Sequence, residues 1–333
     1  MLHRSVKKTA VAAIFAFSAL LFTACARTPG WTVSETFALD TIISVQTLGA
    51  AKTATDAAVS AASETESLVF QTGGNIPELL ETAALVSEIT DGALDLTLTP
   101  VLNAWGFGIS GGEHRVPSDA ELAELLASRG TSVLDVGSAA KGYALKLAGE
   151  KYLAVANTGS CAMLNFGGSF LVLGKKPDGS RVKLGLEDPK NTSGVVGSVK
   201  IENLSVTTSG DYQRYFESGG VRYHHILDPK TGKPANSGLS SVIVVCPDPL
   251  LGDCLSTALF VLGTDGAARI WREYGEQFAF ELVLVTTGGD VFVTENLAKG
   301  WDSIGFGERG AYTSGRAAFF SDRSYSVVAG ALQ

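Results

Sequence analysis

The chain has 333 residues, a formal net charge of −8 at pH 7 and 45% hydrophobic residues. This length is enough to bury a large core, in one domain or in two that pack closely. An acidic chain is poorly suited to a nucleic-acid backbone, so we expect no nucleic-acid partner. The content of glycine, alanine and short β-branched runs is typical of a protein that contains both helices and strands.

The N-terminal segment has the features of an export signal. Three cations precede an uncharged apolar run over residues 10–22, which is too short to span a membrane comfortably. The run leads into Thr23-Ala24-Cys25, and small residues before a single cysteine resemble the lipobox of bacterial lipoproteins. We expect Cys25 to be lipidated; an ordinary signal peptide with an incidental cysteine is the alternative.

This interpretation sets the expected domain organisation and location. Residues 1–24 would be a signal peptide, residues 25–34 a lipid-anchored linker, and residues 35–333 one folded domain. Cleavage before Cys25 lowers the formal net charge from −8 to −11, because residues 1–24 carry three cations and no anion. The mature protein would lie on the extracytoplasmic face of the bacterial cell membrane. We interpret the other cysteines as small core residues, because an odd number without metal-like spacing does not form a disulfide framework: Cys161, Cys246 and Cys254.

Hydrophobic periodicity predicts alternating strands and helices in the first half and mostly strands after residue 163. In the first half we expect strands within 31–48, helices over 54–70, 77–90 and 118–127, a short strand at 133–136, and a helix from about residue 139. In the second half we expect strands over 163–173, 181–186, 196–208, 212–217, 222–227 and 240–246, helices over 253–262 and 264–274, and a hairpin of 280–286 with 290–294.

The first segment with unusual composition is residues 90–95, which is followed by Trp105-Gly106-Phe107-Gly108. Glycines beside aromatic residues allow a planar ligand to approach the backbone. A buried turn with aromatic residues in the core is the alternative.

The second segment is residues 135–144, where Asp135 precedes a turn of small residues and Lys141 lies early in the predicted helix. A helix N-terminus favours anions, and a lysine adds a positive charge for a phosphate. The spacing is not that of a P-loop, and an ordinary turn into a helix is the alternative.

The third segment contains two adjacent histidines, His224 and His225, followed by an Asp-Pro turn. Neighbouring residues of a strand point to opposite faces, so only one of the pair can face a site.

The fourth segment is the apolar helix that begins near Asp253. Asp253 and Thr257 are four residues apart and share a helix face. A carboxylate and a hydroxyl are the hard oxygen ligands that Mg²⁺ prefers. A simple helix-capping role for Asp253 is the alternative.

Taken together, these segments resemble the ApbE family of FAD:protein FMN transferases. The resemblance extends over residues 35–295 and rests on motifs in the same order: Phe37 to Thr41, Thr90 to Gly108, Asp135 to Ala144, Asn165 to Gly168, His225 to Gly232 and Asp253 to Gly263. It implies an α+β fold of mixed, largely antiparallel sheets packed with helices. The segment between Gly108 and Asp135 is shorter than in many members.

The resemblance also implies residue roles. Asp253, Thr257 and the Ser138 carbonyl would bind Mg²⁺, and His225 would be the general base. FAD would be held by the remaining motif residues: Leu39, Trp105, Gly106, Phe107, Asp135, Lys141 and Ile226.

The function implied is Mg²⁺-dependent transfer of FMN from FAD to a threonine or serine hydroxyl of a partner protein, with release of AMP. The partner would be a membrane or extracytoplasmic electron-transfer flavoprotein. Alternatives are an FAD pyrophosphatase that releases FMN and AMP, and a flavin-binding lipoprotein without turnover. With an ordinary histidine pKa, transfer would decline as His225 protonates below roughly pH 6.5.

Overall fold

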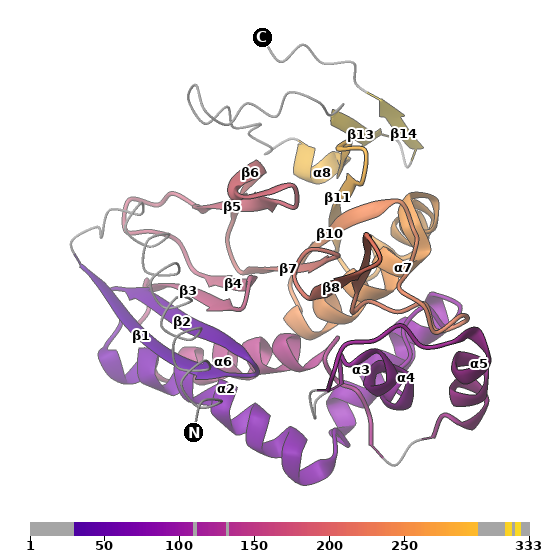
Figure 1. The fold of residues 1–333 in the computed structure, drawn as a ribbon. Coiled ribbons are helices and arrows are strands. Elements are labelled where there is room, and N and C mark those ends of the chain that lie inside the picture. Colours follow the sequence, from indigo (N-terminus) through magenta and orange to yellow (C-terminus); the bar gives the residue numbers. More distant parts are fainter. Residues whose placement is uncertain (1–29, 109–111, 131–132, 299–316, 322–323, 328–333) are drawn as a thin grey trace.

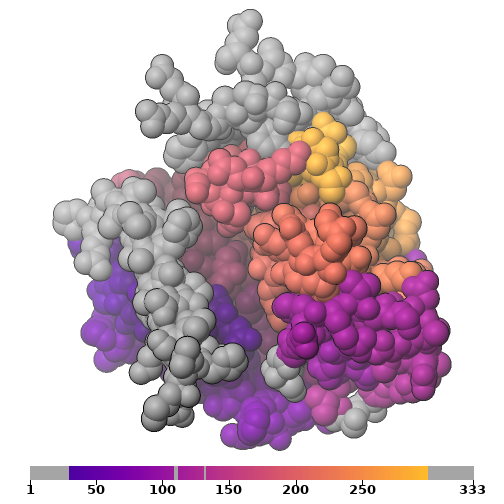
Figure 2. All heavy atoms as spheres, in the orientation of Figure 1, coloured from indigo at the N-terminus to yellow at the C-terminus, as the bar shows by residue number. Residues whose placement is uncertain are grey.

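The computed structural model describes residues 30–108, 112–130, 133–298, 317–321 and 324–327. The predicted signal peptide and Cys25 lie outside these residues. In Figure 1, α2 and α6 lie side by side next to the N-terminal strands, and α3, α4 and α5 group together near α7. In the space-filling view of the same face, the purple-magenta surface of α4 and α5 borders the orange surface of later segments (Figure 2). The fold therefore places its helices against a long sheet.

The main sheet has ten strands in the order β1-β2-β3-β4-β7-β10-β11-β12-β13-β14. Most neighbouring strands in it are antiparallel, so the predicted α+β class is confirmed. Its strands are β1 (Trp31–Ala38), β2 (Thr41–Leu48), β3 (Cys161–Phe166), β4 (Ser169–Leu173), β7 (Leu204–Gly210), β10 (Leu239–Cys246), β11 (Glu281–Thr286), β12 (Val291–Thr294), β13 (Ala317–Ser321) and β14 (Ser324–Val327). Two further sheets each pair two strands: β5 (Val182–Asp188) with β6 (Asn191–Ile201), and β8 (Tyr215–Ser218) with β9 (Val221–His224).

Most of the helices agree with the predicted ranges, whereas α4 and α8 were not predicted. The helices are α2 (Lys52–Thr72), α3 (Pro77–Ile89), α4 (Thr99–Trp105), α5 (Asp119–Ser128), α6 (Ala140–Val155), α7 (Pro249–Tyr274) and α8 (Glu295–Ala298). Ser118 caps α5, because its side chain accepts the Glu121 N–H at 3.2 Å. Within α7, Gly263 has non-helical dihedral angles (φ 71°, ψ −175°), which separates the two predicted helical segments.

Helix α7 is also long and apolar enough to cross a membrane. However, 67% of its most apolar window is buried inside the protein. Its apolar character is therefore explained by the core of the domain, where it packs against β7 and β10.

Some local predictions differ from the structure. The predicted strand at 163–173 is divided into β3 and β4, because Gly167 and Gly168 have positive φ angles (62° and 89°) between them. The predicted strand at 196–208 is divided into β6 and β7, because Asn203 adopts a left-handed conformation (φ 52°) between them. Residues 133–136 form an irregular segment rather than a strand, and a turn follows at 137–139. Strand β1 begins at Trp31, inside the segment 25–34 that we expected as a linker, and pairs there with Leu48 of β2.

Helices α6 and α7 pack closely against each other in the core. Gly142 of α6 lies so close to α7 that an added Cβ would come within 2.4 Å of the Pro249 carbonyl oxygen and 2.6 Å of the Asp253 Cβ. The two helices can approach this closely because residue 142 lacks a side chain. As predicted, the cysteines are buried and free: Cys161, Cys246 and Cys254.

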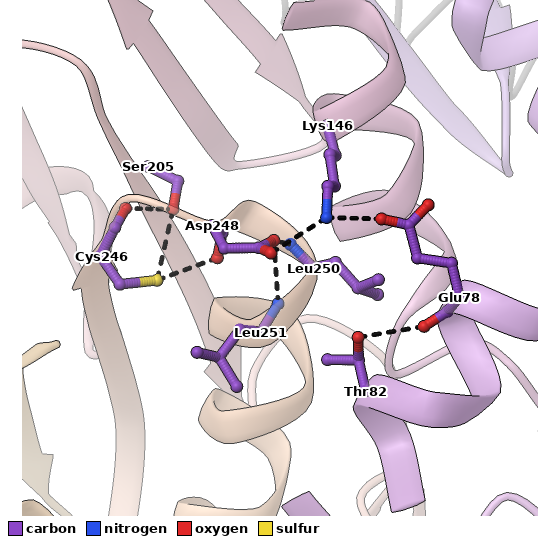
Figure 3. A network of polar contacts seen from close by, with 8 residues as sticks. All are labelled: Glu78, Thr82, Lys146, Ser205, Cys246, Asp248, Leu250 and Leu251. Atoms are coloured by element: carbon purple, nitrogen blue, oxygen red, sulfur yellow. Dashed lines mark hydrogen bonds and ion pairs between the residues drawn. The ribbon is translucent and has the colours of Figure 1, made fainter. Parts of the chain in front are cut away.

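A polar network fixes the start of α7 (Figure 3). The Asp248 side chain accepts the Leu250 N–H at 2.9 Å and also an ion pair from Lys146 of α6 at 3.1 Å. Lys146 makes a second ion pair, at 2.5 Å, with Glu78 of α3. The network therefore ties α3, α6 and the first turn of α7 together, which sets the position of Asp253 one turn later.

Candidate active site

Asp253 is a buried carboxylate at the contact between α6 and α7. Since Asp248 is the cap of α7, the alternative that Asp253 merely caps its own helix is wrong. Asp253 is only 3% exposed, and its Oδ2 accepts the Gly142 N–H at 2.8 Å. Burial raises the pKa of this carboxyl, while the Lys141 charge and the Gly142 N–H oppose the rise. Within the described chain Oδ1 accepts no hydrogen bond.

The backbone around the start of α6 adds a second free oxygen. Gly142 is the third residue of α6, so its N–H has no acceptor within the helix and Asp253 supplies one. Ser138 lies just before the first turn, and its carbonyl accepts no hydrogen bond from any described residue. Such unsatisfied oxygen atoms are available to a cation or to water.

Hydroxyl groups continue the same face of α7. The Thr257 Oγ1 lies 3.1 Å from the Ser209 Oγ of β7, which in turn lies 2.8 Å from the Ser256 Oγ. The described residues contain no group of three or more His, Cys, Asp or Glu side chains suited to a metal ion. A cation bound here would therefore use a mixed oxygen set, and one carboxylate, one hydroxyl and one free carbonyl fit Mg²⁺.

Asp135 and Lys141 flank the turn that leads into α6. The Asp135 Oδ1 accepts the Gly137 N–H at 3.1 Å. Burial raises the pKa of the Asp135 carboxyl, and the charges of Arg214 and Lys141 oppose the rise. Lys141 is the second residue of α6, and its N–H finds no acceptor in the described chain, so the site offers both a backbone donor and a positive charge to an anion.

His225 follows β9 and is held by the backbone of Arg214. Its N–H and its Nδ1 lie 3.1 Å and 3.2 Å from the Arg214 carbonyl oxygen. A ring nitrogen beside a carbonyl must donate, which assigns the proton to Nδ1 and leaves Nε2 as an acceptor. Burial, followed by the charges of Arg214 and Lys141, lowers the pKa of His225 to about 3.

His224 has a different environment. It is 8% exposed, its Nε2 lies 3.2 Å from the Ala235 carbonyl oxygen, and its ring meets Phe260 edge-on at 5.5 Å. Burial lowers its pKa as well. As the strand alternation predicted, the two histidines have different surroundings, and His224 belongs to the core.

The residues Trp105, Gly106 and Phe107 form an aromatic block beside the site, and their contacts are mostly structural. Trp105 is 2% exposed, and its Nε1 donates to the Gly232 carbonyl at 2.8 Å. Phe107 is 4% exposed, with its ring centroid 6.3 Å from that of His225. Gly106 ends α4 in a left-handed conformation (φ 82°). These contacts support the turn after His225, so flavin contact by this block stays a prediction.

Two other predicted flavin contacts, Ile226 and Leu39, do not belong to the aromatic block. Ile226 is 4% exposed and belongs to the core around α7. Leu39 has a left-handed conformation (φ 53°) in the turn between β1 and β2, and its N–H donates to the Glu66 Oε1 at 3.0 Å. Leu39 thus lies in the turn between β1 and β2 of the main sheet, whereas His225 follows β9 of a separate two-stranded sheet.

Comparison with known proteins matches residues 52–280 to the ApbE family model. The chain belongs to the ApbE family. A FAD:protein FMN transferase of Haemophilus influenzae is 32% identical over 249 residues, which cover 68% of this chain and 70% of that relative. The ApbE motifs identified in the sequence are therefore those of a true family member.

Solved ApbE structures agree in fold. The ApbE protein of Thermotoga maritima superposes with a TM-score of 0.72 at 28% identity, covering 81% of this chain and 99% of its own. The flavinyl transferase ApbE of Pseudomonas stutzeri, in its apo form, gives 0.65 at 26% identity and covers 81% and 96%.

The sequence did not identify Arg214 as part of this ApbE site. Its charge acts on Asp135 and His225, and its Nη2 donates to the Phe107 carbonyl at 2.8 Å. The available signal was its place in the predicted strand at 212–217, directly before the predicted strand that carries the two histidines. His114 contacts the same aromatic residues, with its ring centroid 4.9 Å from that of Phe216, and the sequence did not predict this contact.

Burial and two nearby cations place the pKa of His225 at about 3, below the ordinary histidine value assumed from the sequence, which gives a prediction. The folded protein does not bind the proton that the unfolded chain takes up below about pH 6.5, so this group makes stability fall as pH drops from 6.5 towards 3. The ring signals of His225 are identified in NMR spectra as those that disappear in His225→Gln. In the wild type, we expect the chemical shifts of these signals to stay constant from pH 8 to pH 5. His225→Gln should also lose less stability than wild type between pH 7.5 and 5 in denaturant titrations. A midpoint near 6.5 for these signals would contradict the assigned environment.

Proposed function

We propose that this chain transfers FMN from FAD to a threonine or serine hydroxyl of a partner protein, requires Mg²⁺ and releases AMP. The observation that carries the proposal is His225, whose proton lies on Nδ1 and whose Nε2 is an acceptor, beside two cations. The activity of the ApbE relatives supports the same reaction class.

The binding roles follow from charge and free hydrogen-bonding groups. The pyrophosphate of FAD would lie at the start of α6, where the Lys141 N–H and ammonium group favour an anion. Asp253, Thr257 and the Ser138 carbonyl would hold Mg²⁺, since the raised pKa of the buried Asp253 carboxyl reflects a negative charge that lacks full compensation. The cation would neutralise charge on the phosphates and on the leaving AMP.

The chemical step needs little more than positioning and one proton transfer. The acceptor hydroxyl gives its proton to His225 Nε2 while its oxygen forms a bond to the FMN phosphorus. The bond between that phosphorus and the pyrophosphate bridge breaks, and AMP leaves with the bridging oxygen. The hydrogen bond from Nδ1 to the Arg214 carbonyl fixes the ring orientation and the tautomer during this step.

Two alternative functions use parts of the same site. With water in place of the hydroxyl, the site would hydrolyse FAD to FMN and AMP, and free FMN rather than labelled protein would accumulate. A flavin-binding protein without turnover would need neither base nor metal. The free Nε2 of His225 together with the unsatisfied oxygens at Asp253 and Ser138 favours a reaction over storage.

We also propose that the partner is a membrane or extracytoplasmic electron-transfer flavoprotein. The support is the N-terminal sequence, with its positive start, apolar run over residues 10–22 and Cys25. A lipid anchor at Cys25 would hold the enzyme at the surface where such a partner lies.

The base assignment predicts a difference between the two histidines. His225→Asn should slow FMN transfer by on the order of 10²–10⁴-fold, the usual contribution of general-base catalysis, with little change in FAD affinity. His224→Asn, the matched control, should cost far less once its melting temperature is known to allow folding. The measurement is in-gel flavin fluorescence of an acceptor protein incubated with enzyme, FAD and Mg²⁺. Equal losses in both variants would remove His225 from the role of base.

The metal assignment predicts that Asp253→Ala loses transfer and that excess Mg²⁺ restores it poorly. Removal of the carboxylate leaves the phosphate charge less compensated. Asp265→Ala, an exposed carboxylate later in α7, is the control and should behave as wild type. Full transfer by Asp253→Ala at limiting Mg²⁺ is the result that rejects the site.

The anchor assignment predicts that Cys25→Ser abolishes labelling by a fatty-acid analogue and reduces the membrane-bound fraction. Cys161→Ser, which alters a buried cysteine, should leave both unchanged. Unchanged labelling of Cys25→Ser would show that the N-terminus is not a lipoprotein signal.

A further inference from the structure

Arg214 joins three segments of the site. It lies between β7 and the start of β8, and its carbonyl accepts both hydrogen bonds from His225, at 3.1 Å and 3.2 Å. Its side chain crosses to the aromatic block, where Nη2 donates to the Phe107 carbonyl at 2.8 Å. The residue therefore holds the histidine with its backbone while its guanidinium is fixed in a defined place nearby.

The guanidinium of Arg214 is unusual among the described arginines because no described carboxylate pairs with it. Several others form ion pairs: Arg115 with Glu121, Arg129 with Asp95, Arg181 with Glu202, Arg222 with Glu217 and Arg269 with Asp91. A guanidinium has five N–H donors in a planar fork, and in Arg214 only Nη2 donates to a described acceptor, the Phe107 carbonyl. The remaining donors are available to an anion.

The charges in the site lie in an order that separates the two cations. Lys141 directly precedes Gly142, whose N–H donates to Asp253, whereas Arg214 is bonded to His225 through its carbonyl and to Phe107 through its guanidinium. Lys141 is thus the cation at the side of the proposed metal site, and Arg214 is the cation at the side of the base and of Phe107. A pyrophosphate has two phosphates, and the one under attack must lie next to the base.

We propose that Arg214 binds the FMN phosphate of FAD and stabilises the charge that this phosphate carries while its bond to AMP breaks. The inference rests on the proposed function. The hydrogen bond to Phe107 fixes the guanidinium of Arg214 before the ligand binds, and a guanidinium can donate two hydrogen bonds to phosphate oxygens. Donors fixed in this way stabilise the transition state of phosphoryl transfer.

A binding experiment tests the phosphate contact without turnover. The affinities of wild type, Arg214→Gln and Arg214→Lys for FMN and for riboflavin are measured by flavin fluorescence with Mg²⁺ present. Riboflavin lacks the phosphate, so Arg214→Gln should lose about tenfold or more in FMN affinity and little in riboflavin affinity, with Arg214→Lys between. Arg222→Gln, an arginine of the same hairpin paired with Glu217, is the control and should match wild type.

Equal losses for both ligands in Arg214→Gln, or a wild type that binds FMN no more tightly than riboflavin, would overturn the proposal. Transfer assays give the second readout: kcat of Arg214→Gln should fall by on the order of 10²-fold, and Arg214→Lys should recover part of it. A kcat within threefold of wild type, or a loss matched by Arg222→Gln, would also overturn it. If wild type does not transfer FMN to any acceptor, the proposed function fails, and the FMN and riboflavin affinities still decide the role of Arg214.

Discussion

The hydrogen bond from the Gly142 N–H to the Asp253 Oδ2 is the contact on which the site depends. It satisfies a donor that α6 cannot satisfy itself and keeps a carboxylate of α7 in the core beside α6. The bond is possible because residue 142 has no side chain, since a Cβ there would collide with the Pro249 carbonyl and with Asp253. The ion pairs of Lys146 with Asp248 and Glu78 hold the same helix pair from its outer side.

The ionisable groups of the site are not balanced by one another in the ligand-free protein. Burial raises the pKa values of Asp135 and Asp253 and lowers that of His225, so each group resists its charged form. Lys141 offsets this for both carboxylates and Arg214 for Asp135, whereas both cations add to it for the histidine. An anionic ligand accompanied by a divalent cation would balance both sets of charges.

The sequence predicted the elements with clear periodicity and the family, but not the relations between distant segments. Helices α2, α3 and α5 were predicted within a few residues, because their apolar spacing and the cap at Ser118 are local signals. The division between β6 and β7 depends on a left-handed conformation at Asn203, which a run of β-forming residues conceals. Arg214 could not be singled out, because its role depends on the Phe107 carbonyl, 107 residues away in the chain.

The hairpin of β8 and β9 is a sheet of its own, hydrogen-bonded strand to strand from Tyr215–His224 to Ser218–Val221. Arg214 precedes it and His225 follows it, so its open end carries both residues, joined directly by the two hydrogen bonds to the Arg214 carbonyl. The Arg214 backbone and the His225 ring are thus held together at the open end of the hairpin, whereas the Arg214 guanidinium is held by the Phe107 carbonyl outside it. The distance between the His225 Nε2 and the guanidinium therefore depends on how the hairpin is placed against the segment that contains Phe107, and a change in that placement would alter the distance.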